Sequence, residues 1–182
     1  MRSSRYSVAI SLDGYIGPHD HSTAWITDDA SIDFAELYSQ FDIFIMGRTT
    51  YEVMRAQGDA NPFRTRPKES IFVVSQSMRP SEYPEVTVLG ANFLSEIKKL
   101  KEQEGKDIWL FGGGQLLGSC LDAGLVDTIE AAIMPTLLRG GIKMVSDAAA
   151  NPGTLGTKLE LVEVRRLESS GILMTTYKVR YH

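Results

Sequence analysis

The sequence has almost no cysteine and no long hydrophobic run. Cys120 is the one cysteine among 182 residues, so no disulfide can form within the chain, which suits a reducing cytoplasm. It stands among leucines in an expected helix, where we interpret it as a small buried apolar residue. No apolar stretch reaches the roughly 20 residues that a membrane helix requires. Because Asp13-Gly14 interrupts the first apolar run, the N-terminus has no signal-peptide core. We therefore expect a cytoplasmic protein without membrane contact.

Blocks of charge and clusters of metal ligands are missing as well. The 19 basic and 23 acidic residues give a net charge of −4, and no basic run stands out, which argues against a nucleic-acid partner. His19 and His21 share a loop and His182 is terminal, so we expect no metal site. The P-loop pattern and the nucleophile elbow of hydrolases are also absent. A local basic pocket for a phosphate stays compatible with this charge balance.

What the sequence does contain is an alternation of strand-like and helix-like segments. With 43% hydrophobic and 23% charged residues, it is typical of one globular domain spanning residues 1–182. Apolar runs predict strands over residues 6–12, 42–46, 70–75, 86–89, 107–111 and 126–134. Segments 159–167 and 172–181 flank Ser169-Ser170-Gly171 and predict a closing antiparallel hairpin. The pattern favours an α/β fold with a mostly parallel sheet; residues 135–158 are its least defined part.

Two of the expected helices have recognisable starts. Asp28 or Asp29 could cap a helix that runs to about Gln40. Thr49 and Glu52 stand at the S/T-x-x-E spacing of a capping box, so the next helix is expected to begin at Thr49 or just after it.

The first junction with chemical potential is Phe44 to Thr50 (FIMGRTT), where a helix starts directly after a buried strand and Gly47. Unpaired N–H groups and the positive end of the helix dipole favour an anion there. Arg48 adds a permanent charge with a bidentate fork, and the threonine hydroxyls add donors. A capped helix with a solvated arginine is the structural alternative.

The second junction is residues 109–117 (WLFGGGQLL). Glycines lack Cβ, so a pyrophosphate can lie directly against their backbone and accept its N–H groups. A tight turn is the alternative, and the Rossmann fingerprint is incomplete because Leu117 replaces its third glycine. A third strand end, Ser75-Gln76-Ser77, could bind a ribose or adenosine phosphate, or be a plain turn. Open α/β sheets bind ligands at the carboxyl ends of their strands, so we predict one nucleotide laid across these junctions.

At these residues the chain resembles the RibD C-terminal family, the reductase domain of bacterial riboflavin biosynthesis, which shares the dihydrofolate reductase fold. The likeness runs over nearly the whole chain, in segments 8–17 (VAISLDGYIG), 46–52 (MGRTTYE), 111–117 (FGGGQLL), 124–127 (GLVD) and 135–141 (PTLLRGG). The resemblance implies a three-layer α/β/α domain with a mixed, mostly parallel sheet. It also implies NADPH as the cofactor and assembly as a homodimer.

The resemblance further implies roles for individual residues. The cofactor would contact Ala9, Ile16, Gly17, Gly47, Arg48, Thr49, Thr50, Ser75, Gln76, Ser77, Gly112, Gly113, Gly114, Gln115 and Leu116. Within that set, Arg48 with a Ser75 or Ser77 hydroxyl is suited to a 2′-phosphate. The substrate would lie between the first helix and Trp25.

Two carboxylates are candidates for the catalytic role. Asp13, in the S-L-D-G segment, would lie beside the nicotinamide, or it forms the turn. Ala30 stands where a dihydrofolate reductase would place its acid, and Asp33, one turn later, either reaches the pocket or is solvated.

Together these features predict an NADPH-dependent oxidoreductase similar to 5-amino-6-(5-phosphoribosylamino)uracil reductase. Its substrate would be a small heterocycle or a ribosylaminopyrimidine-like compound, and the protein would position it and exclude water. Two alternatives stay open: dihydrofolate reductase proper, and a non-catalytic nucleotide-binding module on the same fold.

Overall fold

The computed structural model describes residues 1–146 and 156–181. Its helices are α1 (Phe34–Ser39), α2 (Arg48–Ala56), α3 (Phe93–Glu102) and α4 (Gly114–Asp122), with short 3-10 turns at Gly58–Ala60, Lys68–Ser70 and Pro80–Glu82. The main strands are β1 (Ser4–Ser11), β3 (Phe41–Gly47), β4 (Ile71–Val74), β5 (Thr87–Leu89), β6 (Asp107–Gly112), β7 (Thr128–Met134), β9 (Lys158–Arg166) and β10 (Leu173–Arg180). Two short strands, β2 (Tyr15–Gly17) and β8 (Ile142–Lys143), pair with each other.

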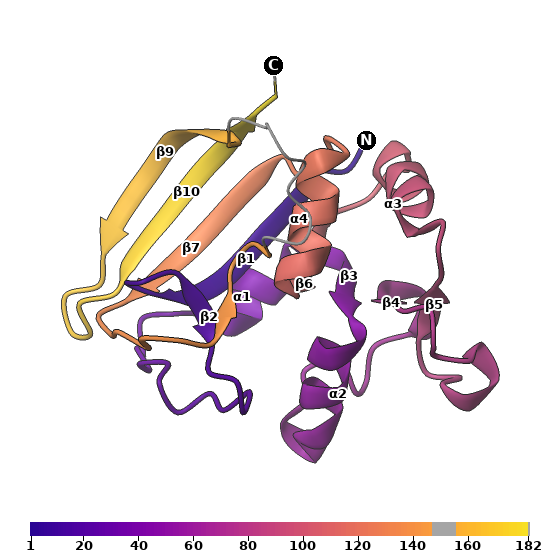
Figure 1. The fold of residues 1–182 in the computed structure, drawn as a ribbon, viewed down its shortest axis with the longest axis horizontal. Helices are drawn as coiled ribbons and strands as arrows, with labels where there is room; N and C mark the ends of the chain where they lie inside the picture. Colours follow the sequence, from indigo (N-terminus) through magenta and orange to yellow (C-terminus); the bar gives the residue numbers. More distant parts are fainter. Residues whose placement is uncertain (147–155, 182) are drawn as a thin grey trace.

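The eight main strands form one sheet in the order β5-β4-β3-β6-β1-β7-β10-β9 (Figure 1). All neighbours from β5 to β7 run parallel. Strand β10 runs antiparallel to both β7 and β9, and a turn at residues 168–170 links β9 to β10. The predicted mixed sheet and its closing hairpin are confirmed.

Helices cover both faces of the parallel part of the sheet. Helices α3 and α4 bury Ile97 and Leu117 against Ile45 on one face, in the larger core. On the other face, α1 and α2 place Tyr38 and Tyr51 against an aromatic cluster that includes Trp109. This is the predicted three-layer arrangement. Side chains alternate along β1. Arg5, Ser7 and Ala9 line the cavity on the α1 side of the sheet, whereas Tyr6 belongs to the larger core on the other side.

Cys120 has no exposed surface and lies in that larger core, as predicted. Burial raises the pKa of its thiol to about 12. A thiol that stays protonated is a poor nucleophile, so Cys120 acts as a packing residue.

The first helix is much shorter than predicted. Asp33 caps α1, and its carboxylate accepts a hydrogen bond from the Glu36 amide at 2.9 Å. The preceding residues form turns instead, because Asp29 ties them to the hairpin. Its carboxylate accepts hydrogen bonds from Ser169 (2.7 Å), Ser170 (2.6 Å), and both the hydroxyl (2.6 Å) and the amide (2.9 Å) of Ser31. These donors hold the pKa of Asp29 well below its usual range.

The predicted capping box at Thr49 is wrong. Helix α2 begins at Arg48, and its N-cap, Gly47, makes no side-chain capping bond. The Glu52 carboxylate accepts instead from Arg48 Nε at 2.7 Å, one helical turn away. The N–H groups at this helix start therefore stay available to a ligand.

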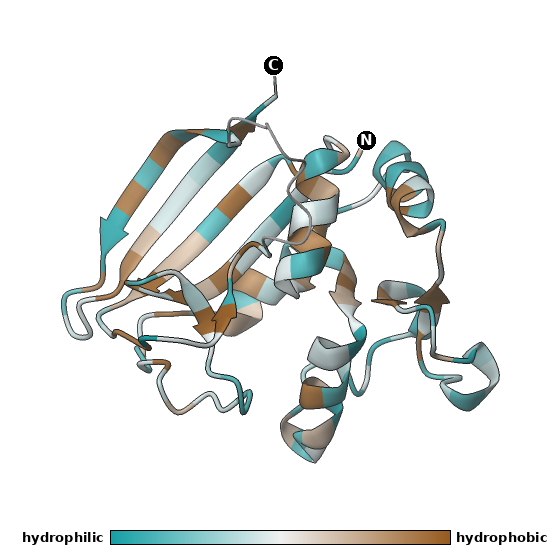
Figure 2. Ribbon diagram, in the orientation of Figure 1, coloured by the Kyte–Doolittle hydropathy of each residue, from teal (hydrophilic) through white to brown (hydrophobic). Residues whose placement is uncertain are grey.

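Strand β9 ends the sheet and is exposed along its whole length. Figure 2 shows hydrophobic segments alternating with hydrophilic ones along it. Three of its apolar side chains are more than half exposed: Leu161, Val162 and Val164. In the part of the chain described, no helix is long and apolar enough to cross a membrane.

Candidate functional site

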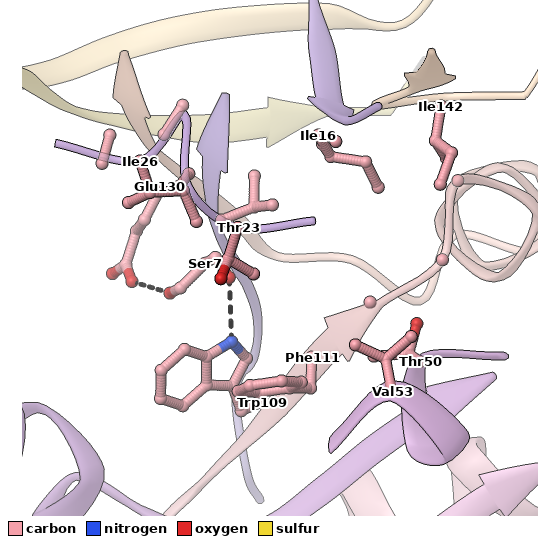
Figure 3. A pocket seen from close by; sticks show the side chains of 18 of the residues that line it. Ser7, Ile16, Thr23, Ile26, Thr50, Val53, Trp109, Phe111, Glu130 and Ile142 are labelled. Carbon is pink, nitrogen blue, oxygen red and sulfur yellow. Dashed lines mark hydrogen bonds between the residues drawn. The ribbon is translucent and has the colours of Figure 1, made fainter. Parts of the chain in front are cut away.

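A cavity of about 1280 Å³ opens at the carboxyl ends of β3 and β6 and continues over the α1 face of β1, β7 and β10. Figure 3 shows Thr50 on one side of it and Ser7, Glu130 and Trp109 on the other. We call its first part the glycine half, lined by Gly47, Arg48, Thr49, Thr50, Ser75, Gly112, Gly113, Gly114, Gln115 and Leu116. We call the rest the strand half, lined by residues of β1, β7 and β10, by α1 and by the loop of residues 21–32.

The two glycine junctions lie side by side. Strands β3 and β6 are parallel neighbours, with Met46 opposite Gly112. A Cβ on Gly112 would lie 3.2 Å from Thr50 Cγ2, and one on Gly47 would lie 3.9 Å from the Gly112 carbonyl oxygen. The helix starts of α2 and α4 therefore face one cavity, and neither has a side-chain cap.

Glycine is required at the second junction for two separate reasons. Gly113 has a φ of +102°, which L side chains rarely adopt. A Cβ on Gly114 would lie 2.5 Å from the Lys143 carbonyl oxygen, because β8 passes directly over this residue. Gly114 is therefore required by the packing of β8, whereas Gly113 presents backbone without a side chain at the start of α4, which fits the close approach of a phosphate.

Arg48 contributes a positive charge to the glycine half. Its Nη1 donates to Ser77 Oγ at 2.8 Å, and Ser75 Oγ lies 3.4 Å from the same oxygen. Ser75 lines the cavity, whereas Ser77 stands just outside the lining and meets it through Arg48. Gln76 is exposed and does not line the cavity. Two hydroxyls and a guanidinium form a donor set that fits a phosphate monoester.

The residues expected around the nicotinamide and the substrate also line this cavity. Ile16 and Gly17 belong to β2, which pairs with β8, and Ala9 belongs to β1; all three line the cavity. Trp25 belongs to the loop that borders the strand half, and it packs on a small core that includes Met134.

Neither predicted catalytic aspartate lines the cavity. Asp13 accepts hydrogen bonds from Ser11 Oγ (2.7 Å) and from the Leu138 and Arg139 amides (3.1 and 2.7 Å), which lowers the pKa of its carboxyl group. It holds the loop of residues 135–141 in place. Asp33 serves as the cap of α1. The structure therefore places Asp13 as a residue of the turn and Asp33 outside the pocket, at the start of α1.

Sequence reasoning missed the polar residues of the strand half. Glu130 of β7 lies opposite Ser7 of β1 and beside Arg5, and all three line the cavity. The available signal was Glu130, a charged residue inside a mostly apolar predicted strand, together with Arg5 directly before another predicted strand. Charges inside central strands are rarely buried unless they are paired.

Comparison with known proteins agrees with this geometry. The model of the RibD C-terminal domain matches residues 3–173. The chain belongs to the RibD C-terminal domain family. It is 27% identical over 178 residues to YyaP, an uncharacterized protein of Bacillus subtilis (strain 168), covering 93% of this chain and 91% of that protein.

Solved structures show the fold. A putative riboflavin biosynthesis protein from Shewanella sp. PV-4 superposes with a TM-score of 0.79 at 21% identity, covering 98% of this chain and 99% of the other. Dihydrofolate reductase from Enterococcus faecalis, complexed with NADP(H) and RAB-propyl, superposes with a TM-score of 0.65 at 14% identity, covering 98% and 97%. This member of the RibD C-terminal domain family therefore has the dihydrofolate reductase-like fold that its sequence predicts.

Proposed function

We propose that this chain is an NADPH-dependent reductase that transfers hydride to a small nitrogen heterocycle, as in the reductase step of riboflavin biosynthesis. One observation carries the proposal: two uncapped helix starts on neighbouring parallel strands face a single cavity. NADPH carries a pyrophosphate and a separate 2′-phosphate on its adenosine ribose, and helix starts bind phosphates. Membership of the RibD C-terminal family and the NADP(H) complex of the Enterococcus reductase support it.

Each part of the glycine half has a distinct role in this proposal. The first-turn N–H groups of α4, reached past Gly113, would bind the pyrophosphate. Arg48 and Ser77 would bind the 2′-phosphate, and Ser75 would lie at the adenosine ribose. The guanidinium would then exchange its Glu52 contact for a phosphate with more charge and more acceptor atoms.

When bound, NADPH supplies a hydride to the electrophilic carbon of a C=N or C=O bond. Ala9, Ile16 and Gly17 would fix the nicotinamide edge that faces the substrate, and Trp25 would shield the face of the ring that receives the hydride from water. The electron pair of the double bond passes to the nitrogen or oxygen, which takes a proton from water. Asp13 and Asp33 are both engaged outside the cavity lining, so we assign the proton to solvent.

Calorimetric titration with NADPH and NADH, followed by NADPH oxidation assays with pterin and ribosylaminopyrimidine substrates, tests the proposal. We expect NADPH to bind more tightly than NADH and to be oxidised with a heterocycle but not with dihydrofolate. Binding of NADPH without turnover of any heterocycle would favour the non-catalytic module, the alternative that the distant Asp13 and Asp33 support. Absence of binding by either coenzyme would contradict both.

We infer that the protein assembles as a homodimer through β9. The strand is nine residues long, β10 is its one partner among residues 1–146 and 156–181, and its apolar side chains are exposed. Such an edge invites pairing with another strand. Light scattering should give twice the chain mass, and Leu161→Lys should shift the protein to a monomer. A monomeric wild type at about 100 µM, where a dimer of micromolar affinity would be almost fully formed, would refute this assembly.

The net charge of −4 and the single buried cysteine support a cytoplasmic protein without nucleic-acid or membrane partners.

A further inference from the structure

The strand half contains a carboxylate whose position is fixed. Glu130 Oε1 accepts a hydrogen bond from Arg5 Nε at 2.8 Å and forms an ion pair with Arg5 Nη2 at 2.6 Å, and Glu130 Oε2 accepts a hydrogen bond from Ser7 Oγ. The Glu130 side chain is 21% exposed and lines the cavity. Figure 3 shows it beside Ser7 and close to Trp109.

The partners of Glu130 are themselves held in place. Arg5 Nη1 donates to Gln40 at 2.8 Å and to Asp107 at 3.4 Å, and its guanidinium lies 4.5 Å from the centre of the Phe41 ring. The Ser7 carbonyl oxygen accepts from Trp109 Nε1 at 3.0 Å. A carboxylate held from both sides in this way is preorganised, so little conformational entropy is lost when a ligand binds it.

Glu130 also keeps capacity to accept further hydrogen bonds. A carboxylate offers about four lone-pair sites, and the hydrogen bonds of Glu130 use one site on each oxygen, with the Arg5 Nη2 ion pair also at Oε1. By contrast, Asp29 accepts four hydrogen bonds and Asp28 is exposed at the rim. Within the described cavity lining, Glu130 is thus the fixed carboxylate with an acceptor site left for a ligand.

The charge of this region is negative. The positive charge of Arg5 is shared by Glu130 and Asp107, so the cluster carries a net charge of −1, and Asp28 and Asp29 add to it at the loop. The other lysine and arginine in the described lining are Arg48, in the glycine half, and Lys143 of β8, whose carbonyl oxygen lies against Gly114 at the start of α4. A phosphate placed in the strand half would therefore meet like charge, whereas an N–H donor or a cation would be attracted.

We propose that the strand half binds an unphosphorylated, neutral or cationic nitrogen heterocycle whose N–H groups donate to Glu130. This inference rests on the proposed reductase function and narrows its substrate. A ring with an amino group beside a ring N–H would donate to Oε2, with one face on the apolar side chains around Trp25. A 5-phosphoribosyl substituent would bring two negative charges to the same wall.

The test uses the full chain, with and without saturating NADP⁺, and measures ligand binding by NMR at millimolar concentrations. Isocytosine presents an amino group beside a ring N–H, and uracil has a carbonyl oxygen in place of that amino group. We expect isocytosine to bind about tenfold or more tightly than uracil, the effect of a hydrogen bond to a charged group. We also expect a ribosylaminopyrimidine to bind more tightly than its 5′-phosphate.

Glu130→Gln provides the matched variant, because it keeps the side-chain volume and one acceptor oxygen while removing the charge. It should weaken isocytosine about tenfold or more, leave uracil unchanged, and leave NADPH affinity unchanged. Equal binding of isocytosine and uracil, tighter binding of the phosphate ester, or no detectable isocytosine binding would overturn the inference in the wild type, whether or not the variant folds. A failure of NADPH to bind would instead refute the proposed function. The two failures can be told apart because heterocycle binding is also measured without the cofactor.

Discussion

The two halves of the cavity are lined by different chemical groups. The glycine half presents backbone N–H groups and one arginine at the ends of strands, where glycines let a ligand approach the backbone closely. The strand half presents side chains from strands, mostly apolar, around Glu130, a fixed carboxylate that keeps an acceptor site for a ligand. The first kind of surface recognises charge and is shared by many phosphate ligands; the second recognises a particular ring. Substitutions should therefore separate the binding of cofactor from the binding of heterocycle.

The largest expected effect is on the glycine half. Gly113→Val places a branched side chain at a φ of +102° and in the path of the pyrophosphate, so NADPH affinity should fall about a hundredfold or more. Calorimetry checks this. The control is Gly124→Val, which has a φ of +68° and open space around it but lies outside the cavity lining. If both variants bind NADPH as the wild type does, Gly113 has no part in the site.

Arg48→Ala should sharpen the comparison within the glycine half itself. Loss of the charged hydrogen bonds to a 2′-phosphate should weaken NADPH about ten- to a hundredfold and leave NADH nearly unchanged. Arg55→Ala, on the same helix but paired with Glu85, should change neither. Equal losses for the two coenzymes would reject the 2′-phosphate role of Arg48.

Asp29→Asn should act on the strand half instead. The variant loosens the loop that carries Trp25, so heterocycle binding should fall severalfold while NADPH affinity stays the same. The pH dependence has a definite sign. Because the folded-state pKa of Asp29 is lowered, its contribution to stability is present above the unfolded pKa of about 3.9 and is lost as pH falls below that value.

Urea unfolding across pH 2 to 7 measures that contribution. The wild type should be more stable than the Asn variant at neutral pH, and the difference should shrink below about pH 4. A difference that is constant across this range would mean that the charge of Asp29 does not hold the loop.

The smallest effect is expected on the opposite face of the sheet. In the structure described, the buried hydroxyl of Tyr6 has no hydrogen-bond partner, and burial raises its pKa. Tyr6→Phe should be neutral or stabilising by about 1 kcal/mol in urea unfolding, and it should leave both cofactor and heterocycle binding unchanged. A loss of either binding would show that the two faces of β1 are coupled.

The same contrast explains how much the sequence could predict. Strands such as β3 and β6 were predictable because an uninterrupted apolar run that ends in glycine is typical of a buried strand. The glycine half follows from local sequence, since strand, glycine and helix start are consecutive residues. The strand half does not, because Glu130 meets Arg5 only through strand pairing across 125 positions of the chain.

The errors have the same origin. The helix predicted from Asp28 or Asp29 became turns because Asp29 bonds to serines 140 and 141 positions away, a competition that no local pattern reveals. The capping box failed because Arg48 recruits Glu52, which leaves the helix start uncapped. Part of the poorly defined region around residues 135–158 lies outside the described residues; its described part contains β8, which packs on Gly114.

The most direct test of the central claim is a calorimetric titration of the wild-type chain with NADPH, followed by structure determination of the complex. The account predicts one NADPH per chain, with its pyrophosphate against the Gly112–Gly114 backbone and its 2′-phosphate within hydrogen-bonding distance of Arg48. No heat of binding with either nicotinamide coenzyme, or a bound coenzyme that touches only one of the two helix starts, would contradict it.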